Sequence, residues 1–257
     1  MTDLQLLTLQ DLQRVCRASK LKYEPSTSKD QLVKILKQQF KELDKKSFAK
    51  IRKLGIPGKE GTVWAIKYKS SLPSPRVGEY RSPDRDSYSK KEYALKQFKS
   101  TKSSKEIIRE SDLQKITAKA GISPKVIEVD ILSKFIVMEL LPGETLFDTL
   151  KKSNGVMTIS EQKDFVRLIE KLDKIGVYHG DPSPLNFIYD NKKILKVIDF
   201  GFGKKMEKGE KDTNMKSMLL GFVLKMKQIG VDVNKNYSYI KKYIDPVDLE
   251  KCGIKVE

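Results

Sequence analysis

Two short segments of this 257-residue chain carry the side chains best suited to chemistry. Residues 179–186 place Asp181 and Asn186 in one loop-like stretch, and residues 197–201 end an apolar run at Asp199. One carboxylate could accept the proton of a hydroxyl group. An amide oxygen and a second carboxylate could hold a divalent metal ion. Phosphoryl transfer from a magnesium nucleotide requires these three groups together.

A glycine-rich stretch upstream could hold the phosphates. Residues 54–63 contain Gly55, Gly58 and Gly61, and an alternating pattern typical of a strand begins at Val63. Glycines let backbone amides approach phosphate closely, so the stretch predicts a phosphate-covering turn between two strands. An ordinary hairpin would contain similar glycines.

A strand-like lysine and a helix-like segment with two glutamates follow this turn. Lys96 lies in a strand-like run, after Ala94 and Leu95. Residues 104–120 have a helical pattern that Gly121 would end, and they offer Glu106 and Glu110 as partners for Lys96. Either glutamate could instead lie on a solvated helix face.

In this order the segments resemble the protein-kinase superfamily. Residues 179–186 are similar to its catalytic loop, and Asp-Phe-Gly at 199–201 is similar to its metal-binding motif. The resemblance implies an α+β, two-lobed fold with a small β-rich lobe and a reduced helical large lobe. It implies ATP and Mg²⁺, with Mn²⁺ as an alternative, as cofactors. The implied acceptors are Ser and Thr hydroxyls of proteins, including those of the chain itself.

The resemblance also assigns roles to residues. Glu110 is preferred to Glu106 as the partner of Lys96 because the residues around Glu110 match the family's helix. The metal ligands would be Asn186 and Asp199. The catalytic residues would be Asp181, Lys96, Glu110 and Asn186. The nucleotide-binding residues, which include a gatekeeper and a hinge, would be Gly55, Gly58, Gly61, Val63, Lys96, Met138, Glu139 and Leu140.

Three features depart from ordinary members of that superfamily. Gly180 replaces the arginine that reads a phosphorylated activation loop, so activation of that kind is not expected. Ser183 replaces a lysine beside the transferring phosphoryl group, and the missing cation would have to come from Lys204, Lys205 or another lysine. No Ala-Pro-Glu follows Asp199, and the large lobe is short. These departures resemble the RIO family and, more closely, the small kinases of the tRNA threonylcarbamoylation complex.

An apolar stripe predicts the helix before the catalytic loop. Ser160 and Glu161 would begin this helix, and Gly176 would end it. We interpret the stripe as core rather than as a ligand site. Its members are Phe165, Leu168, Ile169, Leu172 and Ile175.

The first 45 residues predict a helical hairpin. Leu9, Leu12 and Cys16 would share one face of its first helix, and Ser28 with Gln31 would cap the second. The hairpin resembles the SAP module, which implies DNA binding, but a hairpin packed on the small lobe is slightly favoured over that interpretation. The expected divisions are a hairpin at 1–45, a small lobe at 46–138, a hinge at 139–143 and a large lobe at 144–257.

Composition bears on partners and location. The formal net charge of +17 is compatible with a solvated surface or with binding to nucleic acid. Two cysteines give no disulfide framework, and no apolar run is long enough for a membrane span. We therefore expect an intracellular protein, cytoplasmic or nuclear and not secreted. Residues 70–90 read as a polar insertion.

Three function classes remain open from the sequence. A Ser/Thr protein kinase is favoured because each expected catalytic side chain is present. The second class is an ATPase-like regulatory subunit of a larger complex, and the third is a nucleic-acid-binding protein that keeps the kinase fold as a scaffold.

Overall fold

The computed structural model divides into two compact units. It describes residue 4 and residues 7–18, 21–43, 48–55, 58–68, 90–131, 133–207, 209–210 and 212–255. Unit 1 comprises Met1–Ile108 and Val126–Leu140, and unit 2 comprises Arg109–Lys125 and Leu141–Glu257. The division falls within helix α3 (Ser104–Lys119). One unit is built on a sheet and the other is mainly helical, which confirms the expected α+β class.

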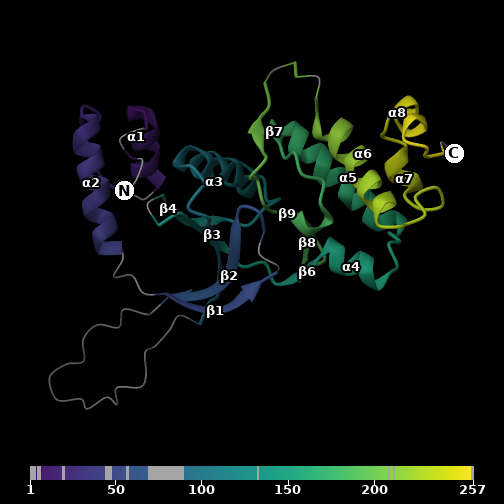
Figure 1. The fold of residues 1–257 in the computed structure, drawn as a ribbon, viewed down its shortest axis with the longest axis horizontal. Helices are drawn as coiled ribbons and strands as arrows, with labels where there is room; N and C mark the ends of the chain where they lie inside the picture. Colours follow the sequence, from purple (N-terminus) through teal and green to yellow (C-terminus); the bar gives the residue numbers. More distant parts are fainter. Residues whose placement is uncertain are drawn as a thin grey trace, which may run out of the picture. The chain divides into compact units, whose positions relative to one another are not determined.

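Unit 1 is built on a five-stranded sheet in which each neighbouring pair of strands is antiparallel (Figure 1). Its strand order is β1-β2-β3-β5-β4. The strands are β1 (Phe48–Leu54), β2 (Gly61–Tyr68), β3 (Tyr93–Phe98), β4 (Val126–Asp130) and β5 (Phe135–Glu139). Strands β2 and β5 are rich in β-branched and aromatic residues, which favour strands. The register of β2, β3 and β5 pairs Val63 with Lys96 and Ala94 with Met138, so three predicted nucleotide-binding residues lie on adjacent strands.

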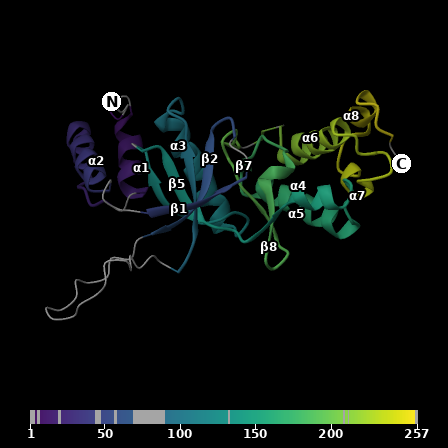
Figure 2. The same cartoon turned by 60° about the horizontal axis from the view of Figure 1, so that its bottom comes forward.

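The N-terminal hairpin belongs to unit 1. Helix α1 (Leu9–Ala18) is capped by Thr8, whose side-chain oxygen accepts a hydrogen bond from Asp11 N at 3.1 Å. Helix α2 (Lys29–Leu43) begins at the predicted capping box, since Ser28 Oγ accepts from Gln31 N and Gln31 Oε1 accepts from Ser28 N. The two helices lie side by side in Figures 1 and 2.

The apolar face of the hairpin packs on the sheet. Leu12, Cys16 and Leu36 are fully buried and share one hydrophobic core with Ile136 of β5. Burial also raises the pKa of the Cys16 thiol. Leu9, which the sequence placed on the buried face, is 41% exposed, so that assignment was wrong. Val15 is buried in its place because it lies one turn from Leu12 on the packed side. The boundary at residue 45 stays a prediction.

Unit 2 contains the remaining helices and two small sheets. A three-stranded sheet has the order β6-β8-β9, and β7 pairs with β10. Helices α5 and α6 pack against each other (Figures 1 and 2). The elements are β6 (Gly143–Thr145), α4 (Leu146–Lys152), α5 (Ile159–Lys174), β7 (Val177–Tyr178), the 3-10 turn η2 (Pro184–Asn186), β8 (Phe187–Asp190), β9 (Leu195–Val197), β10 (Lys204–Lys205), α6 (Asn214–Gln228), α7 (Ser238–Lys241) and α8 (Pro246–Lys251).

Helix α5 precedes the predicted catalytic loop in the chain. Its stripe is core as expected, because Phe165, Ile169 and Leu172 are fully buried. The predicted start at Ser160 was wrong. Thr158 is the N-cap, since its side chain accepts from Glu161 N and the Glu161 carboxylate accepts from Thr158 N. The helix ends before Gly176, whose φ of +68° favours glycine.

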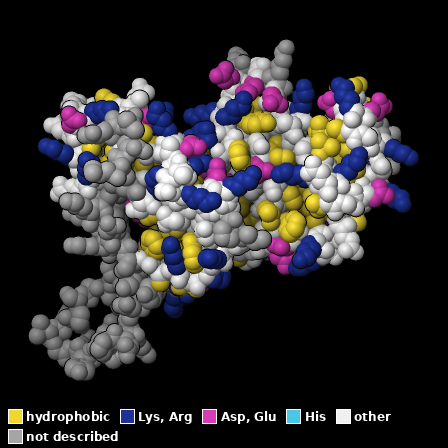
Figure 3. All heavy atoms as spheres, in the orientation of Figure 1, with side chains coloured by type: hydrophobic (Ala, Val, Ile, Leu, Met, Phe, Trp, Pro, Cys, Tyr) yellow, Lys and Arg dark blue, Asp and Glu magenta, His cyan; other side chains and the backbone are white. Residues whose placement is uncertain are grey.

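Lys and Arg side chains are frequent on the surface of the described residues. On the face that Figure 3 shows, the Lys and Arg side chains of the described residues are spread out rather than gathered in one patch. Among the described residues, no helix is long and apolar enough to cross a membrane. The predicted insertion at 70–90 lies, apart from Lys90, outside the described residues.

Candidate active site

The carboxylate of Asp181, in the predicted catalytic loop, meets three donors within unit 2. Asn186 Nδ2 donates to Asp181 Oδ2 at 2.9 Å, and Ser183 N donates to Oδ1 at 3.1 Å. Lys225, on α6, places its Nζ 2.8 Å from Asp181 Oδ1. The structure therefore brings together the predicted residues Asp181 and Asn186 and adds a lysine that the sequence did not identify.

These contacts set the charge of Asp181. Burial alone would raise the pKa of its carboxyl group. The hydrogen bond and charge of Lys225, with the donors Asn186 and Ser183, outweigh that effect and lower the pKa below its usual range. The group is therefore ionised near neutral pH, and an ionised carboxylate can accept a proton.

His179 ties the loop to the segment before Asp199. Its Nδ1 accepts a hydrogen bond from Asp181 N at 3.3 Å, and its Nε2 lies 2.9 Å from the carbonyl oxygen of Ile198. Because Nδ1 is an acceptor and Nε2 faces a carbonyl, the neutral tautomer with the proton on Nε2 satisfies both contacts. The ring is fully buried, and it packs edge-on against Phe200.

Burial lowers the pKa of His179, although the Ile198 carbonyl and the charges of Asp199 and Asp181 oppose the shift. The unfolded chain therefore binds a proton at higher pH than the folded chain. We expect the free energy of unfolding to fall as the pH drops below about 6.5, by at most about 1.4 kcal/mol per pH unit. His179→Asn should flatten this slope, and no other histidine is present to compensate.

This prediction can be checked by urea unfolding of the wild type and of His179→Asn at about pH 7 and about pH 5.5, with circular dichroism as the signal. An equal loss of stability in both proteins over this interval would show that His179 is not the group responsible.

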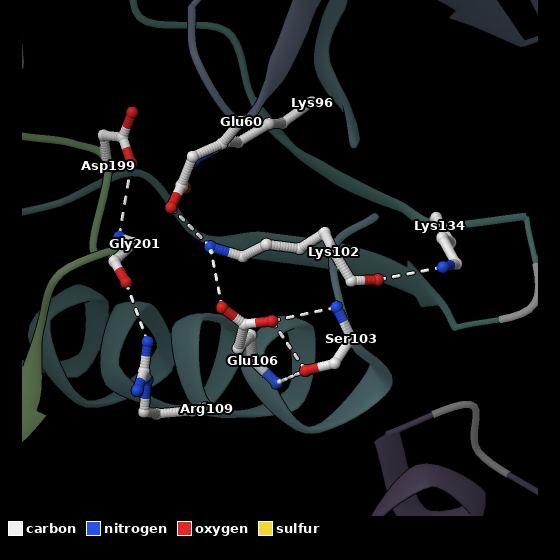
Figure 4. Close-up of polar contacts among 9 residues, drawn as sticks. All are labelled: Glu60, Lys96, Lys102, Ser103, Glu106, Arg109, Lys134, Asp199 and Gly201. Atoms are coloured by element: carbon white, nitrogen blue, oxygen red, sulfur yellow. Dashed lines mark hydrogen bonds and ion pairs between the residues drawn. The ribbon is translucent and has the colours of Figure 1, made fainter. Parts of the chain in front are cut away.

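Asp199 is held in an unusual backbone conformation. Its φ is +66°, a region that asparagine and aspartate tolerate better than most residues and that is often occupied at functional sites. Its Oδ1 accepts a hydrogen bond from Gly201 N at 3.2 Å, and the Gly201 carbonyl accepts from Arg109 at 2.8 Å (Figure 4). Glu110 is 1% exposed, and one of its carboxylate oxygens lies within 4.8 Å of one from Asp199.

In unit 1, Lys96 is 5% exposed and pairs with Glu60 across 3.7 Å. Glu60 lies in the glycine-rich turn, and its other carboxylate oxygen meets Lys102 Nζ at 2.5 Å. Figure 4 shows Glu60 joined to Lys102, whose ammonium also reaches Glu106 at 3.8 Å. The turn is thus fixed to Lys96 by an acidic residue that the sequence analysis did not consider.

The two candidate glutamates of α3 occupy different environments. The Glu106 carboxylate accepts hydrogen bonds from Ser103 N and Ser103 Oγ, at 2.9 and 2.6 Å. It therefore caps the first turn of α3 and pairs with Lys102. This capping role favours Glu110 as the partner of Lys96, and that pairing stays a prediction.

The glycines of the turn meet different requirements of the backbone. Gly55 has a φ of +71°, which favours glycine, and Gly58 N donates to the Gly61 carbonyl at 2.9 Å. A Cβ atom at Gly61 would lie 2.1 Å from the carbonyl oxygen of Gln97 on β3. Gly61 is therefore needed for the close approach of β2 and β3. The part of the turn at residues 56–57 lies outside the described residues.

The predicted gatekeeper and hinge residues lie at the end of β5. Met138 is buried, while Glu139 and Leu140 are half-buried. Their contacts with adenine stay a prediction.

Sequence reasoning missed Glu60, Lys102 and Lys225. Glu60 could have been noticed as the acidic residue inside the glycine-rich turn. The two lysines had no local signal, because the chain contains 51 Lys and Arg residues. Lys102 is 6% exposed, which distinguishes it from ordinary surface lysines only once the fold is known.

The chain is similar in sequence to known protein kinases. The protein kinase domain family matches residues 80–221. The KEOPS complex subunit Bud32 of Pyrococcus abyssi is 31% identical over 116 residues, which cover 45% of this chain and 52% of that protein. A BUD32 homologue of Archaeoglobus fulgidus is 29% identical over 123 residues, or 48% of this chain and 50% of that protein.

One plant kinase matches over a shorter stretch. The rice CBL-interacting protein kinase 24 is 35% identical over 78 residues, which cover 29% of this chain and 17% of that protein. The chain spans about half the length, or less, of these curated relatives.

Proposed function

This chain belongs to the protein kinase domain family, and from that premise we propose that it transfers the γ-phosphoryl group of Mg-ATP to Ser and Thr hydroxyls of proteins, including its own. The observation that carries the proposal is the constellation in unit 2. Asp181 is ionised and hydrogen-bonded to Asn186, and His179 links the loop to the residue before Asp199.

The residues present fit a divalent metal ion. Asn186 uses its Nδ2 to donate to Asp181, so its Oδ1 is the atom suited to a metal. Asp199 supplies a carboxylate whose orientation is fixed by Gly201 N. Oxygen ligands of this kind suit Mg²⁺ or Mn²⁺. When bound, the ion would neutralise charge on the phosphates, and Asn186 and Asp199 would hold it.

Asp181 would position the acceptor hydroxyl and take its proton. The carboxylate is fixed by Asn186 and Ser183, and it is 28% exposed, so an acceptor can reach it. A fixed, ionised carboxylate of this kind contributes through orientation and through proton acceptance. His179 contacts the loop backbone and is a positioning residue.

The nucleotide contacts are proposed for unit 1. Lys96 would orient the α and β phosphates, with Glu110 of α3 as its partner. Its burial beside the Glu60 carboxylate keeps its ammonium group in a defined place. The turn at Gly55, Gly58, Gly61 and Val63 would cover the phosphates, and Met138, Glu139 and Leu140 would meet adenine.

A phosphosite experiment tests the proposal. The purified chain, first treated with phosphatase, is incubated with Mg-ATP, and phosphorylated residues are mapped by mass spectrometry. Phosphoserine or phosphothreonine is expected in the wild type and should be lost in Asp199→Asn, which lacks a metal-binding carboxylate. A matched control is Glu170→Gln, because Glu170 lies on the exposed side of α5 and should not affect transfer.

Phosphate on the wild type and on Asp199→Asn alike would indicate a contaminating kinase and count against the proposal. The proposal would also be contradicted if neither protein became phosphorylated and the wild type labelled no general protein substrate.

A second candidate is an ATP-hydrolysing subunit of a larger assembly. Similarity to a protein named as a KEOPS complex subunit favours it. In that case the wild type should release phosphate from ATP without forming phosphosites, and Asp199→Asn should abolish the release.

A further inference from the structure

One face of α6 runs along the catalytic loop within unit 2. At its N-terminal end, Asn214 Oδ1 accepts a hydrogen bond from His179 N at 2.8 Å, and Asn214 Nδ2 donates to the carbonyl of Val177 at 2.7 Å. One turn later, Ser217 Oγ accepts from Tyr178 OH at 3.0 Å. These three hydrogen bonds fix α6 against the start of the loop.

The same face continues past the loop to Asp181. A Cβ atom at Gly221 would lie 2.7 Å from Pro182 Cγ, so glycine permits the helix to approach the loop closely. Lys225 follows one turn later and reaches Asp181. The contact residues have the spacing of a single helix face. They are Asn214, Ser217, Gly221 and Lys225.

The loop itself lacks a cation at the position where related kinases carry one, since Ser183 stands there. Of the lysines considered from the sequence, Lys204 pairs with Glu210, and Lys205 is exposed on β10. The sequence also left another lysine open as the source of this cation. The lysine at the catalytic carboxylate is Lys225, which comes from a helix rather than from the loop.

We propose that Lys225 is a catalytic residue that supplies from α6 the cation missing at Ser183, and that it contacts the transferring phosphoryl group. This inference rests on the proposed function. The Lys225 side chain is 40% exposed, so a ligand can reach its ammonium group. An ammonium has three N–H donors, and it can keep one on Asp181 while another meets a phosphoryl oxygen.

In the transfer step the acceptor hydroxyl oxygen forms a bond to the γ-phosphorus. The bond from that phosphorus to the β,γ-bridging oxygen breaks, and its electron pair leaves with ADP. The hydroxyl proton passes to the Asp181 carboxylate. Lys225 transfers no proton in this step and stabilises negative charge on the phosphoryl oxygens, an effect that is strongest where donors are already in place.

The test compares steady-state phosphate transfer from Mg-ATP by the full chain and its variants. Lys225→Met keeps the length of the side chain and removes its charge, and we expect kcat to fall about 10²-fold while the KM for ATP stays nearly unchanged. Lys225→Arg should recover part of the rate because it keeps the charge. Lys216→Met, an exposed lysine on the same helix, is the matched control and should transfer at the wild-type rate.

A double variant separates charge supply from structural support. Adding Ser183→Lys to Lys225→Met returns a cation to the same carboxylate from the loop side, and we expect at least a tenfold recovery of kcat. If Lys225 only supported the structure, a lysine placed on the loop would not restore the rate. Thermal unfolding of each variant checks that all of them fold.

Each outcome is decisive. If the wild type transfers phosphate and Lys225→Met matches it, the inference fails and the proposed function stands. If Lys225→Met is slow but neither Lys225→Arg nor the added Ser183→Lys restores any rate, a structural role replaces the proposed one. If the wild type transfers no phosphate, the proposed function fails and the inference fails with it.

Discussion

Replacing Asp181 with Asn is expected to lower kcat for phosphate transfer by about 10²–10⁴-fold, the range typical of a lost general base. The amide has nearly the shape of the carboxylate, so the loop should keep its structure. It can neither take the hydroxyl proton nor balance the charge of Lys225. The KM for ATP should change little because Asp181 is not proposed to hold the nucleotide. Transfer of labelled phosphate from Mg-ATP measures both constants.

Glu170→Gln serves as the control for this prediction as well, since it removes one carboxylate from the exposed side of α5. A rate for Asp181→Asn within tenfold of the wild type would mean that another group accepts the proton, or that positioning alone supplies the catalysis.

Truncating Leu12 to Ala is expected to destabilise unit 1 by about 2–5 kcal/mol, the usual cost for a leucine buried in a packed core. Leu12 is fully buried and belongs to the same hydrophobic core as Ile136 in the sheet. The single tryptophan of the chain, Trp64, lies on β2 and reports on that sheet. The urea midpoint read from its fluorescence should therefore fall in Leu12→Ala.

Leu9→Ala provides the matched control on the same helix. Leu9 is 41% exposed, so its truncation should change the free energy of unfolding by less than about 0.5 kcal/mol. An unchanged Trp64 midpoint in Leu12→Ala would show that the hairpin folds as a separate module, as the resemblance to the SAP module had suggested. Nucleic-acid binding by the hairpin stays a prediction in either case.

The helices show which elements local sequence can predict. Helix α3 was expected at residues 104–120 and spans Ser104–Lys119, because its apolar spacing and its glycine stop are local signals. The cap of α5 was misplaced by two residues, since Thr158 and Ser160 are both suitable caps and only the backbone geometry distinguishes them. The capping box at Ser28 had no such competitor and was predicted correctly.

The hairpin shows where local sequence is insufficient. Its two helices were predictable from their periodicity, but the same apolar faces suit either a separate module or a docked one. The apolar surface of the sheet determines that the hairpin is docked, because it buries Leu12 and Leu36 in a common core. Leu9 was misassigned because a helix of ten residues offers two overlapping apolar faces, and only packing selects one of them.

The sequence by itself determined the chemistry that the chain can carry, because Asp181, Asn186 and Asp199 lie in short segments whose residue types and order are local properties. Tertiary structure decided which charges accompany them. Lys225 is 44 residues from Asp181 in the chain, and Lys102 is 42 residues from Glu60. One lysine among many has no local pattern that marks its partner, so only the packing of α6 on the loop and of β2 against β3 could select these residues.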